Sequence, residues 1–171
     1  MTQYKAVLFD WAGTMVDFGS FAPMAAFVAV FGEFGIEVTE AEARAPMGMA
    51  KIDHIRAMLS HADTSARFEA SHGRRWTEQD VRKIYEVFVP MNEDVAARHA
   101  DLVPGAAQMI EFLRSNNVKI GSTTGYTRSI MARILPIAAK QCYSPDNLVC
   151  SDDGFEGRPS PLGIYQCCKS G

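Results

Sequence analysis

Three apolar runs, separated by stretches with helical patterns, constrain the fold of this 171-residue chain most strongly. They are "KAVLFDW" (5–11), "VKIGSTT" (118–124) and "NLVCSD" (147–152). The first run is nearly continuous, which is typical of a parallel strand that is buried on both faces. Strands that alternate with helices predict an α/β fold with a Rossmann-like parallel sheet and right-handed connections.

The segment between the first two runs is nearly all helical in pattern. Thr77 is a candidate N-cap residue, with Asp80 at the third helical position. We therefore predict an all-helical cap domain (20–98) inserted into an α/β core (1–19 and 99–171). The helical patterns cover 23–35, 40–45, 52–60, 77–100 as one helix or two, 106–115 and 127–140.

The composition indicates a folded globular protein and excludes several functional classes. Hydrophobic residues make up 47% of the chain and charged residues 22%, which excludes a disordered chain. A net charge of -3 gives no overall basic field for a nucleic acid. Neither a signal peptide nor an apolar run of about 20 residues is visible, so we expect a cytoplasmic protein with no membrane partner. We expect reduced thiols at all four cysteines, Cys142, Cys150, Cys167 and Cys168.

Polar residues follow the apolar runs. Asp10 comes at the end of the first run before a "GT" turn, Thr124 ends the second, and Arg158 follows the third in "EGRPSP". In a parallel sheet these strand ends meet at one edge, where ligands bind. A carboxylate that attacks phosphorus, with a hydroxyl and a cation that hold the phosphate oxygens, is a set suited to phosphoryl transfer.

These motifs resemble those of a known superfamily. "FDWAGT" (9–14), "STTG" (122–125) and "GRP" (157–159) are similar to the first three motifs of the haloacid dehalogenase superfamily of phosphotransferases. "DWAGTMVDFGSFAP" (10–23) and "PMGMAKIDHIR" (46–56) resemble its phosphonatase family, which hydrolyses the P–C bond of phosphonoacetaldehyde to acetaldehyde and phosphate. The resemblance covers nearly the whole chain.

The resemblance implies a role for several residues. Asp10 would be the nucleophile that becomes an aspartyl phosphate, and Thr124 and Arg158 would bind the phosphoryl group. Lys51 would form a Schiff base with the substrate aldehyde. The helical cap would place this lysine over the core. Phosphatases of the superfamily have a second acid two residues after the nucleophile, where this chain has Ala12.

A carbon leaving group does not need that acid, because an iminium at Lys51 can accept the electrons of the broken P–C bond. Lys51 must then be a free amine part of the time, which requires a lowered pKa. In a helix, Met47 and Lys51 would be i, i+4 neighbours and Lys51 and His54 i, i+3 neighbours. His54 is therefore a candidate for moving protons during imine formation.

The family also implies a cofactor and a partner. Mg²⁺ would be held by the Asp10 carboxylate and the backbone carbonyl of Ala12. Ser20 and Tyr126 are candidates for lining the entrance to the site. The expected partners are a small-molecule phosphonate and a second copy of the chain, which would form a homodimer through the cap.

The superfamily's fourth motif, an acidic loop after a further strand, has no counterpart before the sequence stops at "YQCCKSG" (165–171). We therefore expect a core that is truncated or altered at its C-terminus, with strand one left as an apolar edge. We also expect no regular helix in "CCKSG" (167–171). Two alternatives to a phosphonatase stay open: a phosphohydrolase that acts on a small phosphate ester, and a catalytically inactive truncated paralogue that binds a partner.

Overall fold

The core of the molecule is a three-stranded parallel sheet. The computed structural model describes residues 4–169, and its strands are β1 (Ala6–Phe9), β2 (Lys119–Thr123) and β3 (Asn147–Val149), in the order β1-β2-β3. Val7 pairs with Ile120, and Ser122 pairs with Leu148. The α/β fold with a parallel sheet is therefore confirmed.

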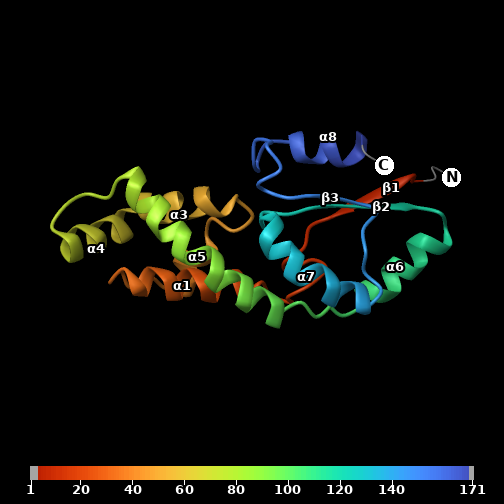
Figure 1. Cartoon of the computed structure of the whole chain (residues 1–171), viewed down its shortest axis with the longest axis horizontal. Helices are drawn as coiled ribbons and strands as arrows, with labels where there is room; N and C mark the ends of the chain where they lie inside the picture. Colours follow the sequence, from red (N-terminus) through yellow and green to blue (C-terminus); the bar gives the residue numbers. More distant parts are fainter. Residues whose placement is uncertain (1–3, 170–171) are drawn as a thin grey trace.

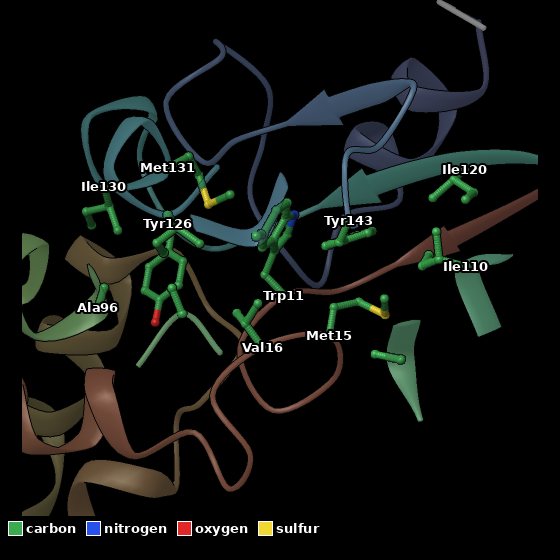
Figure 2. Packing of buried hydrophobic residues seen from close by; sticks show 14 of the residues in the cluster. Trp11, Met15, Val16, Ala96, Ile110, Ile120, Tyr126, Ile130, Met131 and Tyr143 are labelled. Carbon is green, nitrogen blue, oxygen red and sulfur yellow. The ribbon is translucent and has the colours of Figure 1, made fainter. Parts of the chain in front are cut away.

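Helices cover both faces of this sheet (Figure 1). Helices α6 (Ala106–Ser115) and α7 (Arg128–Lys140) lie on one face, and α8 (Leu162–Lys169) lies on the other against β2 and β3. The core cluster below the sheet includes Trp11 and Tyr143, whose ring centroids are 4.8 Å apart (Figure 2). Their burial fixes the backbone immediately after β1.

The other helices form a separate bundle beside the sheet (Figure 1). Its own hydrophobic cluster includes Phe27, which stacks on Phe88 with ring centroids 4.3 Å apart. The two clusters support the predicted division into core and cap, whose boundaries at residues 19/20 and 98/99 stay a prediction. The bundle consists of α1 (Phe21–Glu33), α2 (Glu40–Arg44), α3 (Lys51–Ser60), α4 (Ala62–His72) and α5 (Glu78–Arg98).

Helix α5 connects the bundle to the core. Phe88 belongs to the cap cluster, whereas Ala96, two turns further on, belongs to the core cluster and lies near Tyr126 in Figure 2. The helix packs against α1 and α3 at one end and α7 at the other. It is one continuous helix despite Pro90, because this extensive packing outweighs the lost hydrogen bond. The predicted capping box of Thr77 and Asp80 is present at its start.

Several details of the predicted elements were wrong. The strand predicted over 5–11 spans only 6–9 and is half-buried rather than buried on both faces, whereas its expected position at the sheet edge is confirmed. Helix α4 was not predicted, because only Thr64 and Phe68 in it are buried and its apolar pattern is weak. Helix α8 continues through Cys168 to Lys169, whereas no regular helix was expected there; the rest of "CCKSG" lies outside the described residues.

No helix within residues 4–169 combines the length and the apolar character that crossing a membrane requires. The four cysteines have free thiols, of which Cys150 and Cys167 are buried.

Asp17 ties the two chain segments that join core and cap. Its backbone N–H donates to the carbonyl of Asp101, and its carboxylate accepts hydrogen bonds from the N–H groups of Phe21 and Ala22 at 3.0 and 2.9 Å. Asp17 therefore caps α1, since the side chain of the N-cap residue, Ser20, makes no capping bond. The Asp17 side chain is buried, so these bonds are shielded from water.

We expect Asp17→Asn to lower the free energy of unfolding by about 1 kcal/mol, because the amide offers one acceptor oxygen to two backbone donors. Asn also tolerates the left-handed backbone at this position, where φ is 55°. Urea unfolding measures the change. The control is Asp63→Asn in the first turn of α4, where the side chain is exposed and we expect a change below about 0.5 kcal/mol. Equal effects of the two substitutions would contradict the capping role.

Candidate active site

A small cavity of about 30 Å³ lies where the strand ends of the core face the cap. It brings together residues from four separate parts of the sequence, as expected for the carboxyl edge of a parallel sheet. All but two of the predicted site residues line it, the exceptions being Ser20 and His54. The lining consists of Asp10, Ala12, Pro23, Met47, Gly48, Lys51, Thr124, Gly125, Tyr126 and Arg158.

Asp10 lies directly after β1 and is paired with a cation. Its Oδ1 accepts a hydrogen bond from the Trp11 N–H at 2.8 Å and another from Arg158 Nη2 at 3.0 Å. Its Oδ2 has no hydrogen bond to any described residue. The side chain is 38% exposed, so one oxygen is held in place while the other stays open to a ligand.

Arg158 is anchored by a residue that sequence reasoning missed. Its Nη2 donates to both the carbonyl oxygen and Oγ1 of Thr123 at 2.9 Å. The adjacent Thr124, which was predicted, is buried, and its Oγ1 accepts from the Tyr126 N–H at 3.1 Å. The signal for Thr123 was the doubled threonine in "STTG", because successive strand residues point to opposite faces and each can serve a different partner.

Lys51 is the first residue of α3 and is only 5% exposed. Its Nζ lies 5.1 Å from the ring centroid of Tyr126 in the core and 5.7 Å from that of Phe27 in the cap. The pKa of Lys51 is lowered from its ordinary value of 10.5 to about 8, mainly by burial; Asp10 acts to raise it and the positive charge of Arg158 to lower it. The lysine therefore has a free-amine form within reach of neutral pH.

His54 lies on the same helix but outside the cavity lining. Its Nε2 is 2.8 Å from the carbonyl oxygen of Ala43, and its ring stacks on Phe27. Because a carbonyl only accepts, Nε2 carries the proton and Nδ1, buried without a partner in the described structure, is the free acceptor. Burial and the charge of Lys51 lower the pKa of His54 to about 3, so the ring is neutral at neutral pH.

Of the other three predicted residues, Tyr126 and Met47 line the cavity and Ser20 does not. The Tyr126 ring forms a wall beside Lys51, and burial, reinforced by Asp17 and Asp10, raises its pKa above the usual tyrosine range. Met47 lines the cavity from the turn before α3, so the helical i, i+4 relation to Lys51 was wrong. Ser20 packs against Gly13 at the start of α1 instead of lining the cavity.

The donor set at this cavity fits a magnesium ion. Asp10 offers its unpaired Oδ2, and the carbonyl of Ala12 makes no hydrogen bond to the described residues. Mg²⁺ commonly binds through one or two carboxylates and fills its other positions with water and substrate oxygens. The one group of three ligating side chains found within residues 4–169 is Glu42, His61 and Asp63 in the cap, and none of these lines the cavity.

The comparisons with known proteins agree with this geometry. A family model described as haloacid dehalogenase-like hydrolase matches residues 4–170. The chain belongs to this family. The crystal structure of a β-phosphoglucomutase from Clostridium difficile has a TM-score of 0.74 and 15% identity, over 97% of this chain and 70% of its own. At this identity the likeness shows the fold alone.

More similar relatives are phosphonoacetaldehyde hydrolases. The phosphonoacetaldehyde hydrolases of Paraburkholderia xenovorans and Paraburkholderia phytofirmans are 50% and 51% identical over 166 residues, which is 97% of this chain and 62% of theirs. The crystal structure of a phosphonoacetaldehyde hydrolase-like protein from Oleispira antarctica has a TM-score of 0.96 and 37% identity, over 98% of this chain and 60% of its own. The chain is thus a homologue of these hydrolases and spans about three fifths of their length.

The low pKa of Lys51 predicts a pH-dependent stability. The folded pKa of about 8 lies below the unfolded value of 10.5, so the unfolded state binds more protons between these values and stability rises with pH across that window. We expect wild type to gain about 2 kcal/mol relative to Lys51→Met between pH 7 and pH 10. Urea unfolding at both pH values in metal-free buffer measures this gain.

Lys83→Met is the matched control, because Lys83 is exposed on α5 and its removal should leave the pH dependence unchanged. If the free energy of unfolding changed with pH equally in wild type and in Lys51→Met, Lys51 would have an ordinary pKa in the folded protein.

Proposed function

We propose that this chain hydrolyses the P–C bond of phosphonoacetaldehyde, giving acetaldehyde and phosphate. The observation that carries the proposal is the buried lysine, Lys51, in the same small cavity as Asp10 and Arg158. A solvated surface lysine would not have its pKa lowered in this way. The identity with phosphonoacetaldehyde hydrolases over nearly the whole chain supports the same reaction.

The reaction begins at the aldehyde. The neutral amine of Lys51 adds to the carbonyl carbon, and loss of water gives an imine, which takes up a proton to become an iminium. Burial favours the neutral amine that this step needs. If His54 assists, it does so through Nδ1, because Nε2 is committed to the Ala43 carbonyl.

Cleavage of the P–C bond follows. The Asp10 carboxylate attacks phosphorus, and the electron pair of the P–C bond moves through carbon to the iminium nitrogen. The products are an acyl phosphate on Asp10 and an enamine on Lys51. In this proposal Thr124 and Arg158, which line the same cavity, bind the phosphonate oxygens, and Arg158 offsets negative charge beside Asp10.

Water completes both halves of the reaction. Attack on the acyl phosphate releases phosphate and restores the Asp10 carboxylate. A proton added to the enamine carbon regenerates the iminium, which water hydrolyses to acetaldehyde and free Lys51. Mg²⁺, held by Asp10 and the Ala12 carbonyl, would neutralise negative charge between the carboxylate and the phosphonate.

Ala12 favours this reaction over hydrolysis of a small phosphate ester. An alkoxide leaving group needs a proton from an acid, and Ala12 has none to give at the position where phosphatases of the superfamily have one. The iminium at Lys51 makes that acid unnecessary for a carbon leaving group.

We also propose that the chain pairs with a second copy through the cap. This proposal rests on the family resemblance.

We expect the chain to release phosphate from phosphonoacetaldehyde in the presence of Mg²⁺, and both Lys51→Arg and Asp10→Ala to abolish this release. Arginine stays protonated and cannot form the imine, and alanine cannot attack phosphorus. Borohydride added with the substrate should reduce the iminium and leave a covalent adduct on Lys51 in wild type and in Asp10→Ala. Lys51→Arg should give no adduct. Release without a trapped adduct would instead indicate a phosphohydrolase that uses no imine.

We expect Mg²⁺ together with a non-hydrolysable phosphonate to raise the melting temperature, and the shift to disappear on adding EDTA, because only the folded state binds them. Asp10→Ala, which lacks the carboxylate ligand, should show no shift. A wild type that neither releases phosphate nor gains stability would support an inactive paralogue that binds a partner.

A further inference from the structure

The segment that carries Lys51 into the cavity lies directly on two glycines of the core. A Cβ at Gly125 would stand 2.9 Å from the carbonyl oxygen of Met49 and 3.6 Å from that of Gly48. A Cβ at Gly157 would stand 3.3 Å from the Cβ of Ala50. Residues 48–50, which we call the approach segment, therefore contact the core at positions where it has no side chains.

Backbone conformation does not explain either glycine. Neither Gly125 nor Gly157 has a φ in the left-handed region, so an alanine could adopt the same backbone at both positions. What excludes a side chain is the close approach of the approach segment. At Gly125 the opposing atom is the backbone carbonyl of Met49, which cannot rotate away as a flexible side chain could.

The position of the approach segment determines that of Lys51. Ala50 is the N-cap residue of α3, and Lys51 follows it as the first helical residue. On the core side, Gly125 lies between Thr124 and Tyr126, and the Tyr126 ring is 5.1 Å from Lys51 Nζ. One core turn thus both supports the approach segment and forms the wall that the lysine faces.

We propose that Gly125 and Gly157 are positioning residues, whose missing side chains let the approach segment rest on the core and so place Lys51 in one cavity with Asp10. Neither glycine takes part in the chemistry. The consequence for catalysis rests on the proposed function, whereas the consequence for the burial of Lys51 does not.

Gly125→Ala should move the approach segment outward, because the new methyl group meets a backbone atom. We expect kcat for phosphate release to fall about 100-fold, since displacements near 1 Å have this effect on aligned reactants. KM should change less, because the groups proposed to bind the phosphonate remain. Acetylation of Lys51 by acetic anhydride, followed by peptide mass spectrometry, should become several-fold faster as the lysine is exposed.

A size exchange tests the same idea at the second glycine. Gly157→Ala alone should impair phosphate release and speed acetylation of Lys51, by less than Gly125→Ala does, because the contact is longer. The double variant Gly157→Ala with Ala50→Gly removes the opposing methyl group and should restore both. Glycine is a good N-cap residue, so helix α3 tolerates the second change.

The control is Gly32→Ala in α1, where a Cβ would meet no atom within 4 Å and neither readout should move. Urea unfolding of each variant shows whether it is folded under the assay conditions. The proposal is overturned if acetic anhydride acetylates Lys51 in folded Gly125→Ala at the wild-type rate. It is also overturned if the size exchange restores neither phosphate release nor the slow acetylation of Lys51. If wild type releases no phosphate, the proposed function fails, yet the acetylation results still decide whether the glycines position Lys51.

Discussion

The burial of one lysine between two separately packed hydrophobic clusters is the constraint on which the site depends. Lys51 Nζ lies between an aromatic ring of the cap, Phe27, and one of the core, Tyr126. Desolvation of an ammonium group is costly, so a flexible junction would let the side chain escape to water. Phe27 is held by stacking on both His54 and Phe88, and α5 packs against both bodies. The rigidity of each cluster keeps the lysine out of water.

Charge at the strand ends complements this burial. Arg158 is shared between the Asp10 carboxylate and Thr123, so its charge acts on Asp10 without closing off both carboxylate oxygens. The same guanidinium favours the neutral amine of Lys51. One cation therefore has two effects: it pairs with the Asp10 carboxylate and it favours the uncharged form of Lys51. Both effects are possible because Asp10, Lys51 and Arg158 lie around one small cavity.

The fold and the main site residues could be predicted because their signals are local. Apolar runs ending in Asp10 and Thr124 marked the strand ends, and the resemblance of the motifs identified Lys51 within the helical insert. The sequence showed two adjacent threonines in "STTG" but not which of them contacts Arg158, because that depends on the path of the chain between β2 and Arg158. Helix α4 escaped prediction since few of its residues are buried. The edge position of β1 was predicted, but its consequence, a strand that is only half-buried, was not.

The closeness of the approach segment to the core also bears on how a substrate enters. The small cavity adjoins a larger one of about 290 Å³, and Gly48, Thr124, Gly125 and Arg158 line both. A substrate therefore has room beside the approach segment while the segment stays in contact with the core. Within the described residues no hydrogen bond joins residues 48–50 to Gly125 or Gly157, so that contact is steric alone. The shape of this contact, and not a hydrogen bond, therefore sets where the approach segment lies and with it the position of Lys51.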